Sequence, residues 1–220
     1  MPLRIIPPAV FMIVCASIPA AEPAPDTQKP VILLTGFEPF GRSNFNTSWD
    51  IVSRFEGKEI AGHVVKTLKL KVVYDEIDEP LKEAVEKLKP DVVISFGEGT
   101  RDIHVERVAA NGYHPMKPKD NKRNPPPRER IAPDGPANIE SGLRVDAILK
   151  ALHDAKFRAY DSNDAGGYLC NECFYRLMAL KDAPAVRGFV HVPVIKPSDE
   201  AGRKELEEAV GVLVRAAVEK

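Results

Sequence analysis

The cysteine at position 170 has the surroundings that a thiol nucleophile needs. It follows the glycine pair Gly166-Gly167 and begins a segment with helical periodicity. The apolar face of that segment would carry Cys170, Cys173, Phe174 and Leu177. The positive end of a helix dipole stabilises a thiolate, and the free N–H groups of a helix start can hold an oxyanion. The pattern therefore predicts a nucleophile, although cysteines on apolar helix faces are also common in packed cores.

A thiol nucleophile needs a base, and the base needs an acid that orients it. His191 is the main candidate for the base, because it interrupts the apolar strand-like run 189–192. A core histidine bonded to backbone is the alternative. Glu106 is the candidate acid. Alternatively, Glu106 is a solvated strand residue or forms an ion pair with Arg107. Glu98 is a second carboxylate at a loop edge.

The remaining histidines are weaker candidates. His104 and His114 are expected in or beside the site region, and His63 and His153 on the surfaces of amphipathic elements.

Cys170 and Cys173 also form a Cys-x-x-Cys pair, which is a redox motif in some folds. A thioredoxin-like protein places this pair soon after its first strands, whereas here it falls late in the chain. Whether the two thiols form a disulfide stays open. Two cysteines without a second close pair are too few for a tetrahedral zinc site, and we expect neither a metal nor a cofactor.

Strand and helix patterns alternate along the chain. Strands are predicted at 31–34, 63–73, 92–96, 103–110, 157–160 and 188–192. Helices are predicted at 47–55 after an Asn46 or Thr47 cap, at 80–88 with Pro80 first, at 145–152, from Cys170 onward, and near the C-terminus after a Ser198 cap. Residues 112–137 are proline-rich, charged and without periodicity. This alternation predicts an α/β fold with a mainly parallel, twisted sheet covered on both faces.

Ligands of such folds bind at the carboxyl ends of the strands. Gly36, Gly97 and the loop before Cys170 all lie where a strand or loop leads into the following element. We therefore expect them to meet at this edge of the sheet.

The chain has 220 residues, 44% of them hydrophobic, which fits one well-buried domain. Its net charge of -1 gives no general attraction to nucleic acid or to anionic membranes. Its first 21 residues have a short positive start and an apolar stretch, as in a secretory signal peptide. We expect a signal peptide at 1–21, a proline-rich linker at 22–30 and a single domain at 31–220. The protein would then be exported, periplasmic or secreted, without stable membrane association; if the signal is not used, it would be cytoplasmic.

Five segments resemble, in order, the motifs of the pyroglutamyl peptidase I family. They are Thr35-Gly36-Phe37-Glu38-Pro39-Phe40-Gly41 with Asn46-Thr47-Ser48-Trp49, then residues 106–111, 133–137, 162–171 and 188–193. The matches cover about residues 31–195. Each match is modest by itself, but five in the family's order are specific.

The resemblance implies a three-layer α/β/α sandwich and a catalytic triad of Cys170, His191 and Glu106. It implies removal of an N-terminal pyroglutamyl residue from peptides, through a thioester on the cysteine. Phe37 and Phe40 would hold the flat ring, and Asn46 would also bind substrate. The partners would be peptides with N-terminal pyroglutamate, and a homo-oligomer is compatible with the sequence.

The chain departs from the family pattern at several positions. Glu98 stands where an amide is common, Thr47 replaces a proline, and His104 replaces a small hydroxyl residue. The glycine-rich stretch before Glu106 is shorter, and residues 114–117 lack the arginine that the family carries there. These departures concern substrate preference more than the triad. They leave a second hypothesis, an exported relative that binds blocked peptides without turnover.

Overall fold

The computed structural model describes residues 29–114, 116 and 119–219. The expected signal peptide and nearly all of the expected linker lie outside these residues. No helix in the described part of the chain is long and apolar enough to cross a membrane.

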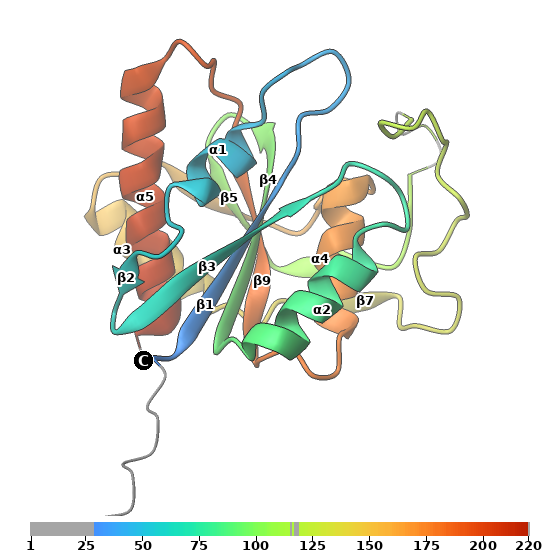
Figure 1. The fold of residues 1–220 in the computed structure, drawn as a ribbon, viewed down its shortest axis with the longest axis horizontal. Helices are drawn as coiled ribbons and strands as arrows, with labels where there is room; N and C mark the ends of the chain where they lie inside the picture. The colour runs from blue at the N-terminus through green and yellow to red at the C-terminus, as the bar shows by residue number, and fades with distance from the viewer. Residues whose placement is uncertain (1–28, 115, 117–118, 220) are drawn as a thin grey trace, which may run out of the picture.

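Helices of the described chain lie around one central sheet (Figure 1), and the strands β4 to β7 (residues 92–140) follow one another in the sequence without a helix between them. The strands are β1 (Val31–Phe37), β2 (Glu59–Ile60), β3 (His63–Leu70), β4 (Val92–Thr100), β5 (Ile103–Glu106), β6 (Val108–Ala110), β7 (Asn138–Glu140), β8 (Ala159–Ser162) and β9 (Val186–Pro193). The helices are α1 (Thr47–Ser53), α2 (Asp78–Leu88), α3 (Val145–Asp154), α4 (Leu169–Ala179) and α5 (Glu200–Val218).

Seven strands form the main sheet in the order β2-β3-β1-β4-β9-β5-β8, and β6 and β7 form a separate pair. Most neighbours in the main sheet are parallel; β2 with β3 and β5 with β9 are antiparallel. The prediction of a mainly parallel sheet is therefore confirmed. The central strands β1, β4 and β9 are buried on both faces, which explains their continuous apolar sequences.

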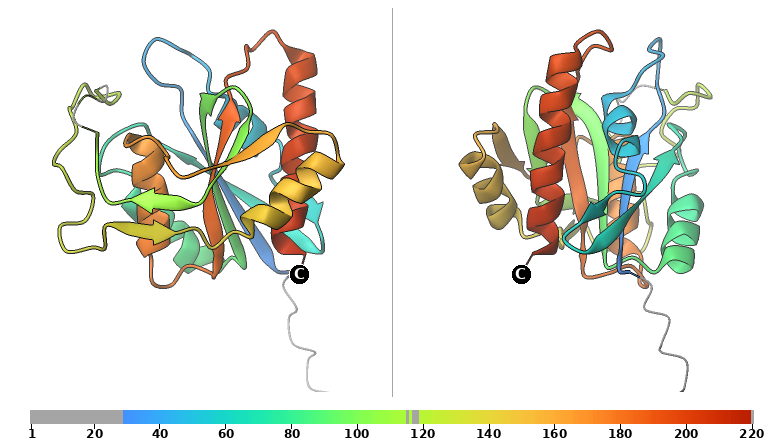
Figure 2. Two further views of the ribbon diagram at one scale, coloured as in Figure 1. Left: turned by 180° about the vertical axis from the view of Figure 1, so that it is seen from behind. Right: turned by 60° about the vertical axis from the view of Figure 1, so that its left-hand side comes forward.

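Helices cover both faces of the sheet, which makes three layers. Apolar side chains of α1, α3 and α5 pack together in the core on one face. Those of α2 and α4 pack on the other face. Figure 1 shows α3 and α5 at the left of the sheet and α2 and α4 at the right, and the turned views of Figure 2 show the same separation.

Several expected boundaries are wrong. The strand expected at 103–110 breaks at Arg107: β5 stays in the main sheet, whereas β6 leaves to pair with β7. Arg107 N–H bonds Ser162 O and its carbonyl accepts from Ser141 N, so the chain is redirected at this residue. The last helix is capped by Asp199, whose side chain accepts from Gly202 N, and not by Ser198.

Other expected elements are shifted by a few residues. Helix α2 begins at Asp78, so Pro80 is its third residue. Strand β3 ends at Leu70 rather than at 73, and β8 begins at Ala159 rather than at 157; Lys156, just before the expected start of β8, has a left-handed backbone with φ 70°. Asn46 is confirmed as the cap of α1, since its side chain accepts from Ser48 N. The excursion 112–137 contains no helix or strand among its described residues.

Candidate active site

Cys170 is the second residue of α4 and is partly exposed. The glycine pair before it has left-handed backbone, with φ 84° at Gly166 and 58° at Gly167, which explains why glycine is needed there. Gly167 also lies against the 112–137 excursion: its carbonyl accepts from His114 N at 2.9 Å, and a Cβ on Gly167 would meet that same nitrogen. The glycines therefore position the start of α4.

His191 lies on β9 and Glu106 at the end of β5, 85 residues earlier in the chain. The antiparallel pairing of β5 with β9 aligns His104 with His191 and so brings Glu106 close. His191 Nδ1 and Glu106 Oε1 are 2.7 Å apart. Both side chains are buried, with 8% of His191 and 1% of Glu106 exposed. The carboxylate therefore holds the imidazole in one orientation.

The thiol of Cys170 also interacts with the imidazole. Burial by itself lowers the pKa of His191, but the charge of Cys170, its hydrogen bond and then Glu106 outweigh burial and raise that pKa to about 10. The structure thus favours the protonated form of His191, whose ring lies between Cys170 and Glu106.

The backbone of β4 makes room for the sulfur. Gly97 aligns with His191 across β4 and β9. A Cβ on Gly97 would lie 2.7 Å from Cys170 Sγ and 2.9 Å from the ring of Phe189. The close approach of the thiol to β4 therefore requires glycine at this position.

A narrow pocket opens beside the thiol. It is lined by Phe37, Phe40, Asn46, Val72, Glu98, Tyr168, Leu169 and Cys170. Phe37 is buried, whereas 38% of Phe40 is exposed at the pocket's edge. The structure therefore brings every residue expected to bind substrate to one pocket beside the expected nucleophile, at the carboxyl edge of β1 and β4.

Asn46 supports this pocket through three hydrogen bonds. Its Oδ1 accepts from the backbone N–H and the hydroxyl of Ser48, and its Nδ2 donates to Glu38 O at 3.2 Å. Ser48 Oγ in turn accepts from Phe37 N at 3.0 Å. The start of α1 is thereby fastened to the end of β1.

Glu98 belongs to the same pocket wall. Its Oε2 accepts a 2.6 Å hydrogen bond from the backbone N–H of Thr47, the first residue of α1. The hydroxyl oxygen of Thr47 accepts from Ile195 N at 3.0 Å, which links the same point to the segment after β9.

Asn171 is a supporting residue that residue-by-residue reasoning did not single out. It is buried, and its amide bonds Ala110 N, Ala110 O and Gly112 O at 2.8–3.0 Å. These bonds tie the end of β6 to the start of α4, beside Cys170. In the sequence, the position of Asn171 directly after the cysteine could have indicated a role at the site. Its hydrogen-bond partners lie about 60 residues away, so local patterns do not reveal them.

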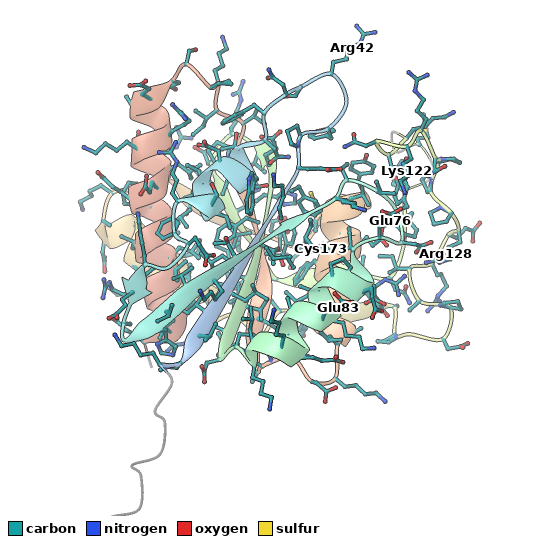
Figure 3. The ribbon with its side chains drawn as sticks, viewed as in Figure 1. Arg42, Glu76, Glu83, Lys122, Arg128 and Cys173 are labelled. Carbon is teal, nitrogen blue, oxygen red and sulfur yellow. The ribbon has the colours of Figure 1, made fainter. Side chains whose placement is uncertain are left out.

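The second cysteine of the pair belongs to the core. Cys173 lies on α4 (Figure 3) and is fully buried, and both thiols are free. Burial raises the pKa of Cys173 to about 12. A thiol without solvent access that resists ionisation is unsuited to redox exchange.

The other histidines make their contacts outside the Cys170 pocket. His63 and His153 bond the carbonyls of Ala61 and Ala159. His104 packs edge-on against the ring of Tyr160, and His114 Nδ1 accepts from Met116 N. None of them lines the described Cys170 pocket.

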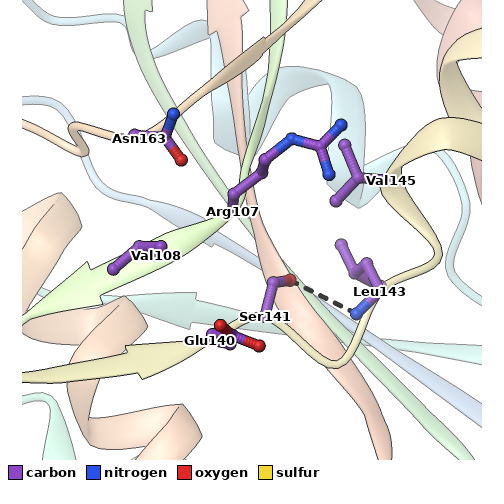
Figure 4. Close-up of a pocket in the computed structure, with 7 residues that line it drawn as sticks. All are labelled: Arg107, Val108, Glu140, Ser141, Leu143, Val145 and Asn163. Atoms are coloured by element: carbon purple, nitrogen blue, oxygen red, sulfur yellow. Dashed lines mark hydrogen bonds between the residues drawn. The ribbon is translucent and has the colours of Figure 1, made fainter.

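A larger cavity of about 260 Å³ lies beside Arg107, next in sequence to Glu106 (Figure 4). The guanidinium of Arg107 forms ion pairs with Asp146 and Asp161. The cavity contains Ser141, whose hydroxyl accepts from Leu143 N, but no histidine. It therefore lacks the base that a serine nucleophile needs. Among the described residues, no group of three or more His, Cys, Asp or Glu side chains could hold a metal ion.

Comparison with known proteins gives consistent matches. The sequence profile of pyroglutamyl peptidase matches residues 30–217. A pyrrolidone-carboxylate peptidase of Bacillus licheniformis is 39% identical over 74% of this chain and 78% of its own length. One from Klebsiella pneumoniae is 38% identical over 86% of this chain and 94% of its own.

Solved structures agree in fold. Pyroglutamyl peptidase I of Bacillus amyloliquefaciens superposes with a TM-score of 0.79 at 30% identity, covering 86% of this chain and 97% of its own. A mutant pyrrolidone carboxyl peptidase of Pyrococcus furiosus superposes with a TM-score of 0.79 at 33% identity, covering 86% of this chain and 98% of its own.

Proposed function

The chain belongs to the pyroglutamyl peptidase family of cysteine peptidases, and on that premise we propose that Cys170, His191 and Glu106 remove an N-terminal pyroglutamyl residue from peptides. The observation that carries the proposal is the buried 2.7 Å contact between Glu106 and His191, with Cys170 on the same imidazole. This arrangement supports the roles of nucleophile, base and orienting acid for the three residues, beside a pocket with aromatic walls.

The imidazole holds its protons in a defined arrangement. Nδ1 faces Glu106, so Nδ1–H donates to the carboxylate and Nε2 is left to exchange a proton with Cys170. The thiolate attacks the acyl carbon of the pyroglutamyl residue, and the imidazolium gives its proton to the leaving amine. Water then hydrolyses the thioester, with His191 as the base, and releases pyroglutamate and the free thiol.

The start of α4 supplies the groups that stabilise the oxyanion. The first backbone N–H groups of a helix have no partner within the helix, and Cys170 is the second residue of α4. These dipoles are fixed before the reaction begins, which is how oxyanion stabilisation lowers a barrier.

The apolar walls of the pocket suit a flat ring. Phe37 and Phe40 offer apolar surface, and Asn46 Nδ2 has two hydrogens, of which one bonds Glu38 O. The second can donate to the ring carbonyl. A pyroglutamyl group has no charged amine, so a largely apolar pocket with few polar groups can hold it.

A fluorogenic pyroglutamyl amide tests the proposal. The reduced full chain releases the fluorophore, Cys170→Ser abolishes release, and the matched Cys173→Ser variant keeps it. A folded, reduced chain that binds the amide without release would favour the non-catalytic hypothesis and overturn the peptidase assignment.

The expected signal peptide supports a second proposal, that the enzyme is exported. The mature chain would then begin at Ala21 or Glu22. N-terminal sequencing of the protein from the periplasm or the medium tests this. An intact Met1 on active protein that stays in the cytoplasm would contradict it.

A further inference from the structure

The pocket beside Cys170 contains a carboxylate among apolar walls. Among the described residues that line the pocket, Glu98 is the only aspartate, glutamate, lysine or arginine. Phe37, Phe40 and Leu169 supply apolar surface around it. An anion in such surroundings is costly unless hydrogen bonds or a cation compensate its charge.

Within the described chain that compensation is one hydrogen bond, and because Glu98 is only partly buried, water supplies the rest until a ligand enters. Glu98 Oε2 accepts the 2.6 Å hydrogen bond from Thr47 N, but Oε1 has no hydrogen bond within the described chain. Nor does any lysine, arginine or histidine of the described residues form an ion pair with Glu98. The pocket therefore offers one negatively charged acceptor to its occupant. Because a carboxylate can only accept hydrogen bonds, the matching group on the ligand is an N–H, and a cationic N–H matches best.

Two kinds of N-terminal residue combine a five-membered ring with an N–H at the ring nitrogen. In pyroglutamate the nitrogen belongs to a neutral lactam, whereas in N-terminal proline it is a secondary ammonium with two N–H groups. The rings have the same size, so the walls formed by Phe37 and Phe40 suit both. Only the prolyl ring carries a positive charge to pair with Glu98.

We propose that Glu98 binds the ring nitrogen of the substrate and thereby extends hydrolysis to peptides that begin with proline. The inference rests on the proposed function, because it uses the same thiol. Cys170 Sγ bonds to the prolyl carbonyl carbon, the peptide C–N bond breaks, and the shortened peptide leaves as an amine with the proton from His191. Water then cleaves the prolyl thioester, giving proline and the free thiol.

Three fluorogenic amides test the inference with the reduced full chain. The pyroglutamyl and prolyl amides are both hydrolysed. The N-acetylprolyl amide is not, since its ring nitrogen has neither charge nor hydrogen. In Glu98→Gln the amide oxygen still accepts from a lactam N–H but no longer pairs with a cation. The ratio of kcat/KM for the prolyl amide to that for the pyroglutamyl amide therefore falls at least about tenfold.

Two further variants separate charge from structure. Glu98→Asp keeps the charge, and its ratio stays nearer to that of the unchanged chain than the ratio of Glu98→Gln does. Glu208→Gln removes an exposed carboxylate on α5 and leaves the ratio unchanged. Thermal unfolding checks that each variant is folded.

The outcomes are distinguishable. Release from the pyroglutamyl amide without release from the prolyl amide overturns the inference and leaves the proposed function intact. So does an equal loss of both activities in Glu98→Gln, because Glu98 would then act only through Thr47. Release from neither amide overturns the proposed function and this inference with it.

Discussion

The backbone N–H of Thr47 donates a 2.6 Å hydrogen bond to Oε2 of Glu98, joining the first residue of α1 to the end of β4. Both residues depart from the motifs that the sequence resembles, in which proline stands at the first position and an amide is common at the second. Proline has no N–H, so the bond exists only because Thr47 replaces it. Two departures that are 51 residues apart in the sequence thus form one contact.

A double-mutant cycle measures this contact. Thr47→Pro removes the donor and Glu98→Ala removes the acceptor, so the two losses are not additive. We expect a coupling free energy of unfolding of about 1.5–3 kcal/mol, as for hydrogen bonds to charged groups. Urea unfolding of the two single variants and the double variant gives the value. Strict additivity would contradict the contact.

The acidity of His191 sets the alkaline limit of activity. Although burial lowers its pKa, Cys170 and then Glu106 raise it to about 10. The imidazolium that donates to the leaving amine is therefore lost as the pH rises towards 10. In Glu106→Gln one stabilising anion is gone, so the alkaline limb of the kcat/KM profile moves to lower pH. An unchanged limb in a folded Glu106→Gln would show that the carboxylate does not act on His191.

A buried carboxyl beside the site makes stability depend on pH. Glu172 is fully buried on α4 and accepts from Asp75 N at 3.1 Å. Burial raises its pKa from 4.5 to about 7. Because the folded-state pKa is raised, the stabilising contribution is complete below pH 4.5 and is lost as the pH rises through 7.

Glu172→Gln imitates the protonated form and tests this linkage. Relative to the unchanged chain it becomes more stable by up to about 3 kcal/mol between pH 4.5 and 8, with little difference at the acidic end. Denaturant unfolding across this pH range measures the change. Glu83→Gln, which removes a carboxylate at an exposed position on α2 (Figure 3), is the matched control.

Gly97 controls the position of the nucleophile. In Gly97→Ala the new Cβ would lie 2.7 Å from Cys170 Sγ, so the sulfur must move. Displacement of a reacting group by about 1 Å lowers rates roughly a hundredfold, and we expect a fall in kcat of that order. Gly57→Ala is the control. It strains a turn with φ 74° but meets no atom within 4 Å, and it lies away from the thiol. Activity retained in Gly97→Ala would contradict the close packing of the sulfur against β4.

Local patterns in the sequence were enough for most of the fold. Continuous apolar runs identify β1, β4 and β9, and the apolar stripe with helical spacing identifies α2 and α5. Their boundaries depend on hydrogen bonds to distant segments, which no local pattern contains. Arg107 is the clearest case: the alternation of residues 103–110 is that of one strand, yet the backbone bonds of Arg107 to Ser162 and Ser141 divide it between two sheets.

For the site, the sequence by itself determined the chemical groups: a thiol at a helix start, a histidine inside an apolar strand, a carboxylate, and two phenylalanines in an ordered set of motifs. Only the tertiary structure decided which of these groups meet. Glu106 reaches His191 because β5 lies antiparallel to β9, a pairing between segments 85 residues apart. Burial likewise separated the two thiols, since one lies at the pocket and the other in the core. A residue's type limits its chemistry, but the packing of distant segments sets its partners, its charge and its access to solvent.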